Sequence, residues 1–179
     1  GGHADFAPTT PQQTRLLENL WREHKHVSVE RACSGIGLPK IHRFLVTEEG
    51  WAEDSAVGAE IAAAADPTPV VVQAALEGRS AVCQEAVALL CDILAAEAGN
   101  LALRLLSTGG IFLGGGIPPR VLPFLRAPRF HEAFLAKGRF SPFLERVPVL
   151  VVVSPQAVLW GAALRGMVPE GDSQNRVGI

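Results

Sequence analysis

A short stretch in the second half of the chain, Gly109–Arg120, places the strongest constraint on how this sequence can fold. It reads Gly-Gly-Ile-Phe-Leu-Gly-Gly-Gly-Ile-Pro-Pro-Arg. Ile111–Leu113 is a short apolar run of strand-forming residues, and Gly114–Gly116 favours a flexible turn. Pro118–Pro119 is typical of the first turn of a helix, which we expect to continue to Leu125. The stretch therefore predicts a strand, a glycine turn and a helix in succession.

This order of elements is common at nucleotide sites. Because glycines lack a Cβ atom, Gly114–Gly116 would let a flat or phosphorylated ligand approach the backbone, and the N–H groups that open the next helix would favour an anion. The same triplet also suits a tight strand-to-helix turn in an α/β protein that binds no nucleotide. Taken alone, the stretch leaves both interpretations open.

Capping residues and apolar spacing predict helices through most of the rest of the chain. Thr10–Gln13 offers an N-cap, a first-turn proline and a capping-box glutamine, and Ser28 can cap a short helix. Apolar residues between Ser80 and Leu106 recur at the period of a long, half-buried helix. The short helix is expected to stop at Gly35 and Gly37. Further helices are expected to start at Pro39, Thr68 and Ser141, and to cover Val57–Ala65, Pro119–Arg126 and Arg129–Ala136.

The last part of the chain predicts one more strand and one more helix. Val147–Val153 is a continuous apolar run, β-branched at most positions, as expected of a strand buried on both faces of a parallel sheet. A final helix is expected over Ser154–Arg165, with four apolar side chains facing inward: Val158, Leu159, Trp160 and Leu164. Residues after Pro169 are expected to fray. The succession of strand, helix and strand indicates an α/β fold, although two parallel strands are too few for a complete sheet.

Composition excludes several classes of protein. With 179 residues and 48% hydrophobic content, the chain can bury a core of its own. Its formal charge of −2 gives no electrostatic case for nucleic acid or an anionic membrane. The uncharged run Val147–Leu164 approaches the length of a membrane span, but Ser154–Gln156 divides it into a strand and a helix. Three cysteines without a Cys-x-x-Cys pair favour a reducing cytoplasm.

The start of the chain suggests a fragment. The only methionine is Met167, so Gly1 is not a translational start, and the Gly-Gly-His opening is typical of the interior of a longer protein. We therefore expect the missing strands of the sheet to lie upstream of Gly1.

Five segments, taken in order, closely resemble the bacterial glucokinase family. The resemblance runs through almost the whole chain and is weakest over Glu48–Glu77. It is carried by Gly1-Gly2-His3-Ala4-Asp5-Phe6-Ala7-Pro8, by His26–Arg31 with Ser34–Leu38, by Gly99–Leu103, by Gly114–Arg120 and by Lys137–Phe140.

The resemblance implies the two-domain ribonuclease H-like fold of actin, the chaperone ATPases and sugar kinases. Glucose and ATP meet in the cleft between the domains in this family. Residues 1–167 would form most of the larger, C-terminal domain, incomplete at its N-terminal side. The helix 154–165 would pack toward the smaller domain, and residues 168–179 would form a frayed tail.

Two residues are expected at the sugar. The family's Gly-Gly-His segment matches Gly1–His3 and its Ser-x-Glu-Arg segment matches Ser28–Arg31, so the resemblance implies that His3 and Glu30 bind glucose hydroxyls. An ionised carboxylate accepts from two neighbouring hydroxyls, and an imidazole donates or accepts. Without the resemblance, His3 would be read as a loop residue and Glu30 as a solvent-facing helix residue.

The nucleotide is expected at the glycine triplet. The family's adenosine motif matches Leu113–Arg120, which implies that Gly114, Gly115 and Gly116 face ATP. Ser34–Gly37 is open to two interpretations, a nucleotide contact or a simple helix stop and turn. His24, His26 and Glu30 have ligand-like spacing, but two of them sit where a helix ends and the zinc motif of the related repressor group is absent, so no metal site is expected.

The catalytic residue is expected outside this chain. The family's phosphate loops and the Asn-Asp pair whose aspartate acts as general base have no counterpart here, and none of Asp5, Asp54, Asp66, Asp92 or Asp172 lies in an equivalent motif. The resemblance implies that the parent enzyme phosphorylates glucose with ATP and Mg²⁺ in the first step of glycolysis, as a cytoplasmic homodimer, and that this chain alone is inactive. A kinase for another hexose, or a sugar-sensing module that binds without turnover, remains an alternative.

Overall fold

A computed structural model gives the fold of the chain and describes residues 2–167. The expected frayed tail, 168–179, and Asp172 lie outside the described residues. In chain order the elements are α1 (Pro11–Trp21), α2 (Val29–Ala32), α3 (Gly37–Thr47), α4 (Ser55–Ala63), α5 (Thr68–Leu76), α6 (Ala81–Leu105), β1 (Ile111–Leu113), α7 (Leu122–Leu125), α8 (Pro128–Leu135), a 3₁₀ turn η1 (Gly138–Phe140), α9 (Ser141–Leu144), β2 (Val149–Val151) and α10 (Ala157–Gly166).

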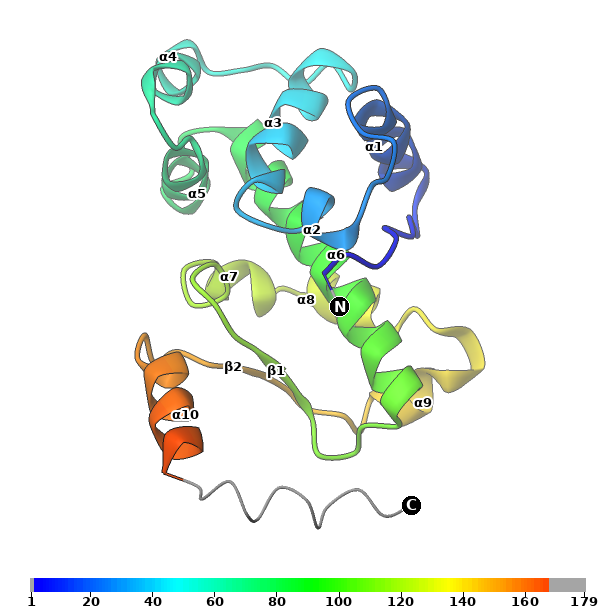
Figure 1. The fold of residues 1–179 in the computed structure, drawn as a ribbon. Coiled ribbons are helices and arrows are strands. Elements are labelled where there is room, and N and C mark those ends of the chain that lie inside the picture. Colours follow the sequence, from blue (N-terminus) through cyan, green and yellow to red (C-terminus); the bar gives the residue numbers. More distant parts are fainter. Residues whose placement is uncertain (1, 168–179) are drawn as a thin grey trace.

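Helix α6 is the central element of the fold, as its apolar period predicts. It crosses the molecule from the group formed by α1–α5 to the part that holds β1 and β2 (Figure 1). Ser80 caps its first turn, with a hydroxyl that accepts from the Cys83 N–H at 3.3 Å. Helices α3, α5 and α8 make the most extensive contacts with it. Its most apolar 18-residue window has the length and composition of a membrane span, but 67% of that window is buried inside the protein.

Local capping fixes the first helix as expected, with one difference in detail. Thr10 Oγ1 accepts from the Gln13 N–H at 3.2 Å, which closes the first turn of α1. The side chain of Gln13, however, accepts from the backbone N–H of Thr9 at 2.8 Å, one residue earlier than in the usual capping box. Gln13 is 1% exposed, so this cap is also part of the core.

The two strands pair in parallel and bury only one of their faces. Ile111 lies opposite Val149, Phe112 opposite Leu150 and Leu113 opposite Val151. Ile111, Leu113, Val149 and Val151 pack on the core, whereas Phe112 and Leu150 are 66% and 44% exposed. The expectation of a strand buried on both faces over Val147–Val153 is therefore wrong. Within residues 2–167, β1 and β2 pair only with each other, and no layer covers the second face.

The helix expected after the glycine triplet is much shorter than predicted. Residues 117–121 form turns in which the Arg120 and Val121 N–H groups donate to the Ile117 carbonyl. The α-helix covers only Leu122–Leu125. Pro118 and Pro119 have no N–H to donate, so they open a turn as readily as a helix. A helix of one turn does not provide the aligned N–H groups that an anion site requires.

Two other boundaries also differ. Gly37 does not end a helix but begins α3, because a turn closed by the Ser34 carbonyl runs directly into it. A Cβ atom at Gly37 would lie 2.7 Å from the Ala32 carbonyl oxygen, so only glycine fits. Helix α10 starts at Ala157 rather than Ser154, without a side-chain cap.

The apolar residues of α10 do not face inward as predicted. The exposed fractions are 79% for Val158, 70% for Leu159, 63% for Trp160 and 65% for Leu164. The helix projects from the end of β2 (Figure 1), and within residues 2–167 it buries none of its residues. The sequence predicts that this helix exists, but no residue within 2–167 covers its apolar side chains.

Candidate functional site

The first described residues pair with the segment that precedes and opens α2. The Phe6 N–H donates to the Val27 carbonyl at 3.0 Å, the Val29 N–H to the Ala4 carbonyl at 2.8 Å and the Glu30 N–H to the Gly2 carbonyl at 3.0 Å. The run is antiparallel, with a bridge between Asp5 and Ser28. This pairing brings together two motifs that are more than twenty residues apart in the sequence.

His3 and Glu30 meet at the end of this pairing. The distance between His3 Nε2 and Glu30 Oε2 is 3.7 Å, and the two side chains are 91% and 55% exposed. Ser28 caps α2 by accepting from the Arg31 N–H at 3.4 Å, which fixes the direction in which Glu30 leaves the helix. A carboxylate and an imidazole side by side at the surface can together hold the hydroxyls of a polar ligand.

The glycine triplet lies at the surface directly after β1. Gly114, Gly115 and Gly116 are exposed, and a Cβ atom at any of them would meet no atom within 4 Å. Gly115 has φ of +105°, which L side chains rarely adopt. The triplet thus leaves a bare stretch of backbone open to a ligand.

A groove of about 500 Å³ adjoins the segment that follows the triplet. Ile117 and Arg120 form one wall, and α5 forms the other. The lining residues from α5 are Thr68, Pro69, Val72, Gln73 and Leu76. The groove combines apolar walls with an amide, a hydroxyl and a guanidinium, a mixture that suits a flat heterocycle with polar edges.

The α2–α3 turn also reaches this groove. Thr68 Oγ1 donates to the Gly35 carbonyl at 2.6 Å. A Cβ atom at Gly35 would lie 4.0 Å from both Ile117 Cδ1 and Thr68 Cγ2. Of the two interpretations left open for Ser34–Gly37, the turn is confirmed as a structural element, and its place beside the groove keeps the nucleotide contact as a prediction.

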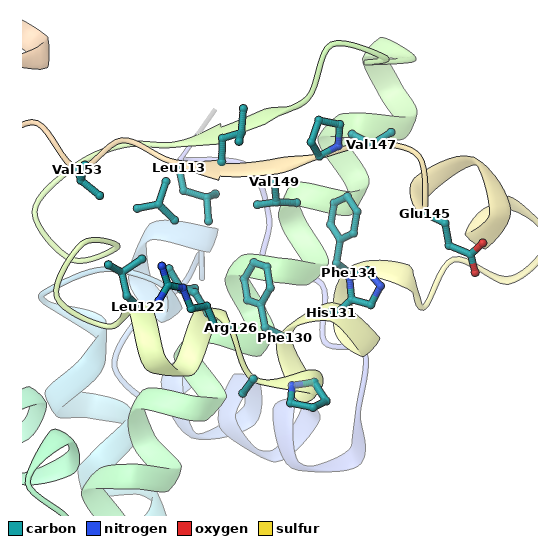
Figure 2. A pocket seen from close by; sticks show the side chains of 16 residues that line it. Leu113, Leu122, Arg126, Phe130, His131, Phe134, Glu145, Val147, Val149 and Val153 are labelled. Carbon is teal, nitrogen blue, oxygen red and sulfur yellow. The ribbon is translucent and has the colours of Figure 1, made fainter.

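A second groove contains none of the predicted site residues. It has a volume of about 650 Å³ and lies between the strands and helices α7 and α8. Figure 2 shows Phe130 and Phe134 pointing from α8 toward Leu113 and Val149. Arg126, His131 and Glu145 add polar groups to its lining. Its mainly apolar walls offer few partners for sugar hydroxyls, so we assign no substrate to it.

Two of the glucokinase-like motifs, Gly99–Leu103 and Lys137–Phe140, contact each other and have a structural role. Lys137 Nζ donates to Asn100 Oδ1 at 2.8 Å, and burial lowers the pKa of Lys137. A Cβ atom at Gly99 would lie 2.8 Å from the Phe134 carbonyl oxygen and 2.9 Å from Lys137 Cε. Gly99-Asn100 and Lys137-Gly138 therefore hold α8 closely against α6 and do not point to a ligand.

Each described aspartate already has a partner. Asp5 Oδ1 lies 2.8 Å from His26 Nε2. Asp54 caps α4, and Asp66 accepts from the Thr68 N–H at 3.0 Å. Asp92 accepts from Arg129. These contacts give each described aspartate a structural role, and the location of the general base elsewhere stays a prediction.

Neither metal nor thiol chemistry is supported by the described residues. Within residues 2–167 no three His, Cys, Asp or Glu side chains lie close enough together to hold a metal ion. His24 Nε2 lies 2.7 Å from Lys40 Nζ, and His26 contacts Asp5. Burial raises the pKa of Cys33 and of Cys91 to about 12, which keeps both thiols neutral and unreactive.

Comparison with known proteins decides the family. A sequence model described as Glucokinase matches residues 1–167. The chain belongs to the glucokinase family. The glucokinase of Nostoc punctiforme is 38% identical over 176 residues, which are 92% of this chain and 52% of that protein. The glucokinase of Yersinia enterocolitica is 38% identical over 162 residues, 90% of this chain and 47% of that protein.

Solved structures agree with this family and its fold. A crystal structure of a glucokinase from an Antarctic psychrotroph aligns with a TM-score of 0.76 at 34% identity, over 91% of this chain and 48% of that one. A glucokinase from Balamuthia mandrillaris, solved in complex with glucose, aligns with a TM-score of 0.69 at 21% identity and supports the fold alone. The chain thus has a glucokinase-type sugar kinase fold with α/β content, and it spans about half the length of the glucokinases it matches.

No sequence motif predicts the groove beside α5. Thr68, Val72, Gln73 and Leu76 lie in the part of the chain where the glucokinase resemblance is weakest, and they form no recognisable motif. The only signal was the Thr68-Pro69 helix start, which predicts α5 but not what faces it. The contact with Ile117 depends on the tertiary structure.

Proposed function

We propose that the protein catalyses ATP-dependent phosphorylation of glucose to glucose 6-phosphate, the first step of glycolysis. The observation that carries this proposal is the His3–Glu30 pair, which the fold assembles from two glucokinase motifs and leaves accessible. Membership of the glucokinase family supports the reaction type. A sugar kinase must hold its acceptor by the hydroxyls it does not phosphorylate, and this pair has the chemistry to do so.

The sugar is held by charge-assisted hydrogen bonds. Glu30 accepts from two adjacent hydroxyls of the hexose, and His3 bonds to a hydroxyl within reach of Glu30. Each bond to the carboxylate is worth about 1.5–3 kcal/mol. Because α2 is capped and Glu30 is tied to Gly2 through its backbone, the carboxylate is oriented before the sugar arrives.

The nucleotide lies along the glycine triplet and the groove beside α5. Gly114–Gly116 lets the nucleotide approach the backbone, and Ile117, Val72 and Leu76 provide apolar walls for the base. Arg120 and Gln73 supply polar contacts at the groove. This arrangement positions ATP without taking part in bond making.

The γ-phosphoryl group passes in line from ATP to the 6-hydroxyl of glucose, whose proton goes to a carboxylate outside residues 1–179. Domain closure would exclude water, which otherwise competes with the sugar as acceptor. Mg²⁺ neutralises phosphate charge in reactions of this class. Within residues 2–167 no cluster of three His, Cys, Asp or Glu side chains could hold this ion.

We further propose that residues 1–167 form most of the larger, C-terminal domain of a ribonuclease H-like fold that is incomplete at its N-terminal side. The uncovered face of β1 and β2 and the exposed apolar residues of α10 support this, since both require partners. Helix α10 would pack toward a smaller domain. A cytoplasmic homodimer is the proposed state of the whole enzyme, with no nucleic-acid or membrane partner.

The test is a coupled assay on the intact protein with ATP and glucose, galactose or N-acetylglucosamine as acceptor. Turnover with glucose at the highest kcat/KM is expected. Turnover with another hexose alone would identify a different sugar kinase. Tight glucose binding without turnover would instead indicate a sugar-sensing module.

A further inference from the structure

The turn between α2 and α3 touches both halves of the candidate site. Glu30 lies on α2, and Gly35 lies in the turn that follows this helix. The Gly35 carbonyl accepts from Thr68 at the first residue of α5, and Gly35 also lies beside Ile117, just after the glycine triplet. A single hydrogen bond therefore joins the segment that carries the sugar ligand to the wall of the groove.

The part of the turn next to α2, the helix that carries Glu30, is held by close backbone contacts. Cys33 is bonded to α2 through its backbone, with 2.6 Å between its N and the Val29 carbonyl oxygen. Gly37 packs so closely on Ala32 that a Cβ atom would overlap the Ala32 carbonyl. Displacement of Gly35 would thus be passed to α2 rather than absorbed in a flexible loop.

Thr68 is held on its other side as well. Its backbone N–H donates to Asp66 Oδ1 at 3.0 Å, and its side chain lines the groove next to Pro69. The side chain is half-buried, which limits competition from water for the hydroxyl. A ligand that presses on the groove wall formed by α5 and Ile117 therefore acts directly on the Thr68 hydroxyl and its acceptor.

We propose that Thr68 is a positioning residue that couples nucleotide binding to sugar binding, through its hydrogen bond to Gly35 and from there to Glu30. The inference rests on the proposed function, because it needs ATP in the groove and glucose at Glu30. Thr68 does not touch the reacting atoms. It makes the orientation of Glu30 depend on whether the groove is filled, so each ligand raises the affinity of the protein for the other.

The experiment measures glucose affinity of the intact protein by calorimetry, with and without the non-hydrolysable analogue AMP-PNP. The ratio of the two dissociation constants is the coupling factor. Thr68→Val keeps the shape of the side chain but removes the hydroxyl, and should reduce the coupling factor about two- to tenfold. Glucose affinity without the analogue should change little. Thr68→Ser keeps the hydroxyl and should retain the coupling.

Gln73→Ala is the matched control within the groove. Gln73 lines the groove, but its side-chain amide bonds to Glu77 on the surface and not to the turn. This variant should weaken AMP-PNP binding while keeping the coupling factor. In steady state, Thr68→Val should raise the glucose KM at saturating ATP more than it lowers kcat, a split that a general loss of structure would not produce.

The inference would be overturned if Thr68→Val left the coupling factor unchanged. It would also be overturned if the wild type bound both ligands with a coupling factor of one, which means no coupling. Either result would leave the proposed function intact. Failure of the wild type to bind either ligand would overturn both. If Thr68→Val does not fold, Thr68→Ala removes the same hydroxyl without adding volume, and the same outcomes apply to it.

Discussion

Asp92 on α6 accepts a hydrogen bond from Arg129 on α8, with 2.7 Å between Asp92 Oδ2 and Arg129 Nε. The same guanidinium bonds to both carboxylate oxygens of Glu85 at 2.7 and 2.9 Å. Asp92 is 8% exposed, and burial raises its pKa while Arg129 lowers it. This three-residue cluster fastens α8, and with it the part of the fold that holds β1 and β2, to the central helix.

Arg129→Met should lower the free energy of unfolding by about 2–3 kcal/mol. This loss is smaller than that for a fully buried ion pair because the Arg129 side chain is 42% exposed. The variant leaves the buried Asp92 charge without its cation. A drop of about 4–10 °C in melting temperature is expected. The control is Arg79→Met, which breaks surface pairs with Glu60 and Glu77 and should cost under about 1 kcal/mol.

The loss of folding stability caused by Arg129→Met should become smaller as the pH is lowered from 7 toward 5. A carboxyl whose pKa is raised in the folded state contributes stability at low pH that is lost as the pH rises through the folded pKa. Removal of Arg129 raises the Asp92 pKa further. Equal losses at both pH values would show that packing, not the buried charge, accounts for the effect.

Glu30→Gln in the intact protein should lower kcat/KM for glucose about ten- to a hundredfold, equivalent to about 1.5–3 kcal/mol, because it removes the charge from the hydroxyl acceptor. ATP affinity should barely change. Steady-state kinetics and nucleotide titration check this. Glu48→Gln, at a surface pair with Arg22, is the control and should be silent. Loss of ATP binding with normal glucose binding would contradict the assignment of Glu30.

Gly115→Ala should raise the ATP KM about tenfold or more and leave the glucose dissociation constant unchanged. The backbone at φ of +105° has a cost of about 1–3 kcal/mol for a residue with a Cβ atom, so the loop must rearrange. Gly50→Ala provides the control, because Gly50 also has a positive φ, +72°, but lies in the turn after α3. It should cost stability without changing the ATP KM.

His42 should make stability fall as the pH drops below about 6.5. The side chain is buried, its Nε2 has no hydrogen-bond partner, and burial lowers its pKa from 6.5 although Glu53 lies 3.6 Å away. A group whose protonation is disfavoured in the folded state contributes stability at high pH, which is lost on acidification through its unfolded pKa. His42→Leu should therefore give a flatter curve of melting temperature between pH 8 and 5. A curve parallel to that of the wild type would exclude this role.

Residues 1–179 expressed alone should not phosphorylate glucose and should self-associate. Every described aspartate is engaged in a structural contact, and Trp160 and Leu159 on α10 are 63% and 70% exposed. Size-exclusion chromatography with a coupled assay tests both points. Replacing Leu159 and Trp160 with Gln should restore the elution volume expected for 19.0 kDa. Turnover at the rate of an intact kinase would show that the base lies within the chain.

The sequence alone determined which helices and strands form and where several of them begin. Thr10 and Ser28 cap helices as predicted, because capping depends on atoms three residues away in the chain. It also determined the family, because the motifs around His3, Glu30 and Gly114–Gly116 lie in a recognisable order.

Only the tertiary structure decided what each element faces. The same apolar pattern describes α6, which is the core of the fold, and α10, which is exposed, because periodicity reports a face but not its partner. Likewise, the meeting of His3 with Glu30 and of Thr68 with Gly35 depends on pairing between segments far apart in the chain. Such contacts arise from the balance of packing over the whole fold, which no local sequence signal encodes.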